Sequence, residues 1–131
     1  MSAWRTCGHF TSWLGLCPHQ DISGGKVLRS SPKKTKNRAK IALRMAAQSL
    51  HHSDRALGEF YRRMRTRLGA PKAIGATTHK LARIIYTMVK YHKEYYDLGA
   101  EYYETRYRER QVKNLNHKAA RLGWTLVPVQ G

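Results

Sequence analysis

The chain has 131 residues, of which 25 are Lys or Arg and only 8 are Asp or Glu, so its formal net charge at pH 7 is +17. Hydrophobic residues make up 41% of the sequence, which is enough for a modest core and excludes a globally disordered chain. The length fits one domain or part of a larger protein. A charge of this size opposes compaction of the chain, and its natural partner is a polyanion, with nucleic acid the first candidate. A membrane-spanning role is excluded, because no run of about 18 apolar residues is present.

The N-terminal residues 1–18 lack the charged front and the uninterrupted apolar centre of a secretion signal, so a cytoplasmic location is predicted. Two cysteines do not make a disulfide framework. They do form two Cys-x-His units, Cys7 with His9 and Cys17 with His19. Zinc ligands are usually separated by about two to four residues, so these units favour buried or incidental thiols over a metal site. No metal-binding residues are therefore predicted.

A short helix is predicted over residues 9–16, because apolar residues line one side of it and Pro18 ends it. Residues 18–34 are rich in Gly, Ser and Pro and are predicted to form a loop. The next helix is expected to begin at Thr35 or Asn37, since either side chain can cap it.

The following helix is predicted to start at Ser53 and carries the clearest amphipathic stripe, which consists of Leu57, Phe60, Tyr61, Met64 and Leu68. Gly69 is predicted to end this helix, and Pro71 is predicted to lie at the start of the next one. The helix after them presents an apolar set (Leu81, Ile84, Ile85, Met88 and Tyr91), and small residues between 73 and 82 permit close packing on its flank. A long polar helix over 100–121 ends near Gly123.

No strand alternation is found outside the last few residues. The predicted fold class is therefore all-α: a compact bundle of about four to five helices, with a glycine loop near the N-terminus and a long polar C-terminal helix. The predicted division of the chain is a helical domain over residues 1–98, followed by a helical extension and an extended tail over 99–131.

The chemistry is concentrated around the run SGGK at residues 23–26, where successive glycines can turn backbone N–H groups toward an anion. Between residues 22 and 53 there are eight Lys or Arg and no Asp or Glu. The predicted nucleic-acid-binding residues are Lys26, Arg29, Lys33, Lys34, Lys36, Arg38 and Lys40. An ordinary flexible loop beside a solvated basic helix is the alternative, because Gly-Gly turns are common. A Walker phosphate loop is excluded by the spacing.

Aromatic residues can stack on nucleobases, but most of the tyrosines fall near apolar helical stripes, so core packing is predicted for them. Tyr102 and the nearby Arg106 are better candidates for an exposed contact.

The run FTSWLGLCP at residues 10–18, the following SGGK and the basic helix that contains Arg38 together resemble the C-terminal domain of the insertion-sequence 116/110/902 transposases, relatives of the Piv-type DNA invertases. The later run KLARIIY at residues 80–86 is similar to the last core helix of that domain. The resemblance covers roughly residues 9–96.

This resemblance implies a mechanism for DNA strand transfer during transposition. In the family, a serine of this domain attacks a DNA phosphate, and a separate RuvC-like domain holds divalent metal, expected to be Mg²⁺, on acidic residues. Ser23 matches the nucleophile, and Gly24 shapes its turn. Family members often carry a pair of serines before the glycine, whereas this chain has Ile22 and Ser23.

The implied partners are DNA, a guide RNA in some family members, and further copies of the full-length protein, within the bacterial nucleoid. The acidic domain has no counterpart in these residues, so the chain is expected to be a C-terminal portion that binds no cofactor itself and is inactive without the metal domain. The alternative function is a non-enzymatic basic helical module that binds nucleic acid through its phosphates.

Overall fold

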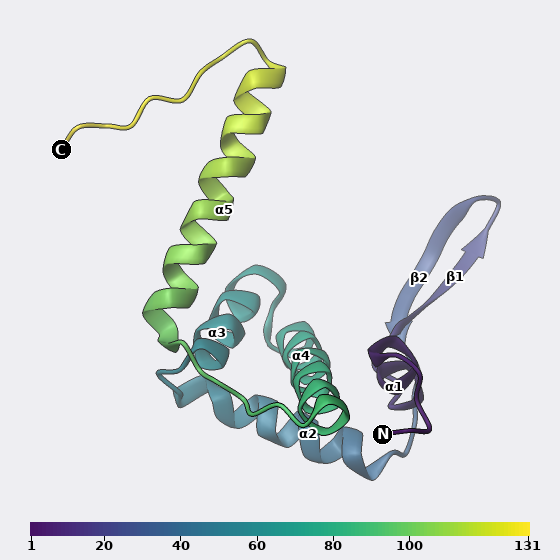
Figure 1. Ribbon diagram of the computed structural model, residues 1–131. Coiled ribbons are helices and arrows are strands. Elements are labelled where there is room, and N and C mark those ends of the chain that lie inside the picture. The colour runs from purple at the N-terminus through teal and green to yellow at the C-terminus, as the bar shows by residue number, and fades with distance from the viewer.

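The computed structural model describes all residues, 1–131, and contains five α-helices, one short 3-10 helix and one two-stranded antiparallel sheet (Figure 1). In chain order the elements are α1 (Cys7–Trp13), β1 (Pro18–Ser23), β2 (Lys26–Pro32), α2 (Arg38–Ser49), η1 (Leu50–His52), α3 (Ala56–Leu68), α4 (Ala70–Tyr91) and α5 (Gly99–Arg121). None of the helices combines the length and the apolar character that crossing a bilayer requires.

The segment predicted to be a loop is a β-hairpin, so the all-α fold class is wrong in this element. Gly24 and Gly25 have φ angles of 55° and 75°, which fit a type I′ turn and its match to the twist of the strands. The register runs from Pro18 opposite Pro32 to Ser23 opposite Lys26, with one irregularity beside Asp21. Both faces of the hairpin are exposed, so its sequence has no need of the alternation that usually reveals a strand.

A small core joins α1 to α4. Its buried residues are Phe10, Leu14, Leu16, Ala82 and Tyr86. The Tyr86 hydroxyl donates a hydrogen bond to the Trp4 carbonyl (3.0 Å), and the Lys90 ammonium donates to the Arg5 carbonyl (2.7 Å). The N-terminal residues are therefore anchored on the second half of α4. The short helix predicted over residues 9–16 is confirmed but covers Cys7–Trp13, so it ends well before Pro18.

The predicted helix-end signals hold at Asn37, Gly69 and Pro71, but α3 begins at Ala56 and not at the predicted Ser53. The Asn37 side chain accepts a hydrogen bond from the Ala39 N–H (2.9 Å) and so caps α2. Gly69, with a φ angle of 84°, ends α3, and Pro71 stands in the first turn of α4.

The face that α4 buries differs from the prediction. Its fully buried residues are small or polar: Ala73, Thr77, Thr78 and Ala82, together with Tyr86. Small side chains let α4 lie close to α2 and α3, so the larger apolar residues at its flanks stay only half-buried. Of the predicted apolar set, Tyr91 is exposed.

The long polar helix α5 is confirmed, but it projects away from the α2–α4 body together with the C-terminal tail, as the hairpin does elsewhere (Figure 1). These two parts therefore differ from the compact bundle that was predicted. Arg63 of α3 holds the first half of α5: it pairs with Glu104 at 2.8 Å, and its guanidinium lies 3.9 Å from the centre of the Tyr107 ring. α5 begins at Gly99, while the division of the chain into two domains at residue 98 stays a prediction.

A substitution at Gly58 tests how closely α3 packs on the preceding turn. A methyl group there would lie 2.0 Å from the Ser53 carbonyl oxygen, so we expect Gly58→Ala to lower the free energy of unfolding by about 1–3 kcal/mol, measured by urea denaturation. The matched control is Gly75→Ala in α4, where the added carbon meets nothing within 4 Å. This second change should stabilise the helix by up to about 1 kcal/mol. Equal effects of the two substitutions would contradict the packing described.

Candidate nucleic-acid interface

Ser23 lies at the tip of the hairpin, as the last residue of β1, opposite Lys26 of β2. Its side chain is exposed, and its hydroxyl forms no hydrogen bond. The one ion pair on the hairpin joins His19 to Asp21 at 3.5 Å, and both of those side chains are exposed. A serine hydroxyl is a weak nucleophile until a base removes its proton, and the hairpin provides no base hydrogen-bonded to Ser23.

Five of the seven predicted basic residues fall into two groups along the hairpin and the linker that follows it, whereas Arg38 and Lys40 belong to α2. Lys26 is at the tip beside Ser23, and Arg29 is farther along β2, opposite Asp21. Lys33, Lys34 and Lys36 lie beyond the base of the hairpin, in the linker to α2.

A groove of about 930 Å³ opens at the base of the hairpin, between this linker, α2 and the first half of α4. We call it the basic groove. Its lining includes six Lys or Arg side chains and one histidine but no Asp or Glu: Lys33, Lys34, Lys36, Lys40, Arg44, Lys72 and His79. The groove thus brings together four of the predicted basic residues and three that were not predicted, whereas Lys26, Arg29 and Arg38 do not line it.

Lys40 is buried, which corrects its assignment as a residue that faces phosphate. Its ammonium group donates hydrogen bonds to the carbonyl oxygens of Gly15 and Lys33, both at 2.9 Å. Burial, and secondarily the charge of Arg44, lowers the pKa of Lys40. The side chain therefore joins α2 to the end of α1 and to the linker, and its role is structural.

Two of the three residues that sequence analysis missed come from a different part of the chain. Lys72 and His79 belong to α4, which reaches the linker only because α2 and α4 pack together. Arg44 lies one turn beyond Lys40 on α2. Burial, with a further contribution from Arg83, lowers the pKa of His79 and so favours the neutral imidazole, which can donate one hydrogen bond. The charge density of residues 22–53 pointed to Arg44, but no local signal pointed to the two α4 residues.

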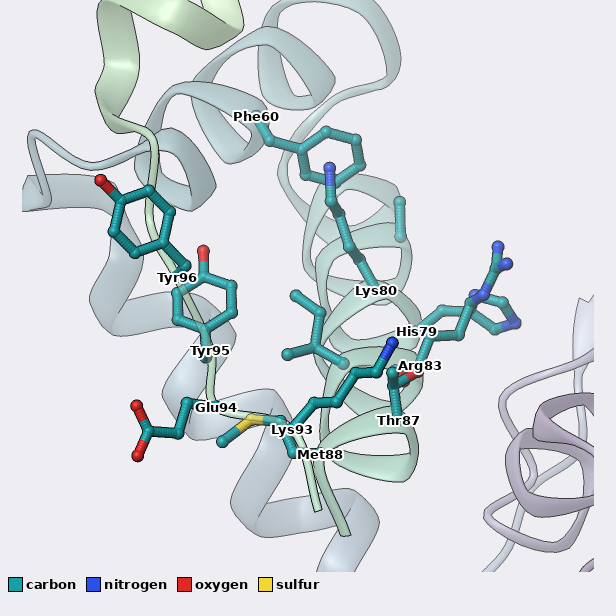
Figure 2. Close-up of a pocket in the computed structure, with 12 residues that line it drawn as sticks. Phe60, His79, Lys80, Arg83, Thr87, Met88, Lys93, Glu94, Tyr95 and Tyr96 are labelled. Carbon is teal, nitrogen blue, oxygen red and sulfur yellow. The ribbon is translucent and has the colours of Figure 1, made fainter. Parts of the chain in front are cut away.

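A second hollow, of about 630 Å³, lies between α4 and residues 93–96 (Figure 2). Lys80 extends along α4 toward Phe60, and its ammonium lies 4.1 Å from the centre of that ring. Tyr95 and Tyr96 form the opposite wall, and sequence analysis did not single out either of them.

Tyr102, the predicted exposed aromatic residue, is exposed, with Arg106 at 6.0 Å from its ring centre.

The two Cys-x-His units do not come together. Cys17 contacts the Thr11 hydroxyl at 3.4 Å, while His19 pairs with Asp21. No group of three or more His, Cys, Asp or Glu side chains in the chain could hold a metal ion.

The resemblance to a transposase family is confirmed for the N-terminal part of the chain. Residues 1–62, just under half of the 131, match the model of a family described as Transposase IS116/IS110/IS902 family. The match supports the family assignment and covers α1, the hairpin, α2 and the first half of α3. The match does not extend to residues 80–86, where similarity was also expected. No curated protein and no solved structure matches the chain.

Removal of the Lys40 ammonium should destabilise the protein. Lys40→Met keeps most of the apolar stem but leaves two carbonyl oxygens without this donor, and we expect it to cost about 1–3 kcal/mol of unfolding free energy in urea denaturation. Lys36→Met, at an exposed position in the same linker, is the matched control and should stay within about 0.5 kcal/mol of the wild type. A Lys40→Met protein as stable as the control would show that the buried ammonium is dispensable.

Proposed function

We propose that the chain is the nucleic-acid-binding part of a transposase and that the basic groove binds the phosphate backbone of DNA. The observation that carries this proposal is the lining of the groove, with six Lys or Arg side chains and no carboxylate. The family match supports a role in DNA transposition, and the net charge of +17 supports a polyanionic partner.

The cationic side chains of the groove lack protein counter-charges. The five ion pairs of the structure lie on the hairpin, α3 and α5, and none involves a residue that lines the groove. Neighbouring cations repel one another, so a phosphate backbone placed among them relieves this repulsion and releases the counterions of the nucleic acid. Lys33, Lys34, Lys36, Arg44 and Lys72 are the residues proposed to contact phosphate, with Lys40 supporting the linker from beneath.

Ser23 is proposed to be the nucleophile of strand transfer, as its match to the family implies. Its Oγ would form a bond to a DNA phosphorus, the bond from that phosphorus to a sugar oxygen would break, and this oxygen would leave with a proton. The hairpin holds Ser23 away from the helical body (Figure 1), so DNA held in the groove can extend along the ribbon toward its tip. A group outside the hairpin must accept the serine proton, which is consistent with a requirement for the metal-binding domain of the family.

One observation favours the alternative of a non-enzymatic binding module. Ser23 is fully accessible and makes no hydrogen bond to a base, as expected if its hydroxyl has no chemical task. Both functions predict the same DNA binding, so they are separated by strand transfer and not by affinity.

The groove is tested by Arg44→Ala combined with Lys72→Ala. We expect affinity for duplex DNA to fall about 10-fold or more, and the slope of log affinity against log salt to decrease in magnitude by about 1–2, since each lost phosphate contact contributes about 0.9. Fluorescence anisotropy over a range of salt concentrations measures both quantities.

The charge-matched control is Lys118→Ala combined with Arg121→Ala, at the exposed end of α5. It removes the same net charge outside the groove, so the salt slope should change by much less. If the two double variants lose affinity equally, net charge alone governs the binding and the groove is not the site.

Ser23→Ala tests the nucleophile. With the family's metal-binding domain supplied, we expect this variant to bind DNA with unchanged affinity and to lose strand transfer below detection, measured as recombinant product in a plasmid assay. Ser30→Ala, an exposed serine on β2 of the same hairpin, is the control and should remain active. Strand transfer that survives Ser23→Ala would exclude this serine as the nucleophile.

A further inference from the structure

The hollow of Figure 2 is lined by aromatic rings and cations and belongs to no part of the proposed strand-transfer site. We call it the aromatic pocket. Its α4 wall includes Lys80, Ile84 and Met88, and its other wall is the segment that carries Tyr95 and Tyr96. The volume of about 630 Å³ falls within the range of roughly 300–1,000 Å³ that is typical of small-molecule sites.

The rings of the two tyrosines in the pocket are accessible to a ligand. Tyr95 is 41% exposed and Tyr96 is 79% exposed, and neither ring pairs with another aromatic ring of the protein. Exposed aromatic rings give a planar ligand a face on which to stack. The half-buried Ile84 supplies apolar surface on the facing wall.

The charges of the pocket favour an anionic ligand. Lys80 is half-buried and forms no hydrogen bond or ion pair, and its charge faces only the rings of Phe60 and Tyr103. Burial lowers the pKa of Lys80, with further contributions from Arg110 and Arg83. Four basic or imidazole side chains line the pocket against the single carboxylate of Glu94: His79, Lys80, Arg83 and Lys93.

The aromatic pocket and the basic groove lie on two sides of α4 and share residues of that helix. Ala76 and His79 line both hollows. A strand whose phosphates occupy the basic groove can therefore cross α4 beside His79 and reach the aromatic pocket on the other side of the helix. Arg83, one turn farther along α4, also lines that pocket.

We propose that the aromatic pocket binds one unpaired nucleotide of a DNA or RNA strand, with its base against Tyr95 and Tyr96 and its phosphate beside Lys80 and Arg83. The proposal rests on nucleic-acid binding by the basic groove. A base within a duplex is covered on both faces by its neighbours, so only an unpaired base can offer a face to these rings. Exposed aromatic rings beside cations are the usual combination in sites for single strands.

The test compares the wild type with the double variant Tyr95→Ala and Tyr96→Ala. Each is titrated by fluorescence anisotropy with single-stranded DNA, single-stranded RNA of the same sequence, and the corresponding duplex DNA. We expect the double variant to bind at least one of the single strands about 10- to 100-fold more weakly and the duplex within about twofold of the wild type. The strand type that is weakened identifies whether the pocket takes DNA, RNA or both.

Two controls separate stacking from folding. Tyr91→Ala removes another exposed tyrosine that lies on α4 but does not line the pocket, and it should leave all three affinities unchanged. Tyr95→Phe combined with Tyr96→Phe keeps both rings and should retain wild-type affinity for the single strands.

The outcomes distinguish this proposal from the one on which it rests. Unchanged single-strand affinity in the alanine variant, or an equal loss for duplex and single strands, overturns the aromatic pocket while leaving the basic groove intact. Failure of the wild type to bind any of the three nucleic acids overturns both proposals.

Discussion

The buried ammonium group of Lys40 joins the three segments that meet at the base of the hairpin. Its hydrogen bonds to the carbonyls of Gly15 and Lys33 connect α2 to the end of α1 and to the linker after β2. The same junction requires a glycine, because a side-chain carbon on Gly15, which has a φ angle of 70°, would lie 2.6 Å from the Thr35 hydroxyl. Both the direction of the hairpin and one wall of the basic groove therefore depend on this junction. The buried Lys40 thus positions the cations that are proposed to contact nucleic acid.

The stability of this protein is limited by the features proposed to bind nucleic acid. Its core is small and is concentrated between α1 and α4, while the basic groove collects cations without counter-charges. Repulsion among these cations opposes folding, and added salt or a bound polyanion should offset it. By contrast α5, where Arg63 pairs with Glu104 and covers the Tyr107 ring, is held by an ion pair and an aromatic contact that need no ligand. The structure thus places its uncompensated charge where a ligand can neutralise it.

Sequence patterns predicted the helices well, because their signals are local: Asn37 caps α2 and Gly69 ends α3 as expected. The hairpin was missed because a ribbon exposed on both faces leaves no alternating pattern, although its Gly-Gly turn is one of the preferred hairpin turns. The candidate site was predicted in part. Charge density identified the linker lysines, but whether Lys40 is buried, and whether Lys72 joins the linker, depends on how α2 packs against α4. The proposed role of Ser23 comes from the family resemblance and not from its surroundings, which contain no activating group.

Lysine footprinting tests the central claim, that the basic groove is the nucleic-acid interface. The chain would be acetylated at low reagent concentration with and without saturating duplex DNA, and modification would be quantified at each lysine by mass spectrometry. We expect bound DNA to protect the groove lysines strongly from acetylation and to protect Lys118, near the end of α5, very little. The groove lysines are Lys33, Lys34, Lys36 and Lys72. Uniform protection of all five lysines, or protection of Lys118 with the groove lysines still reactive, would contradict this claim.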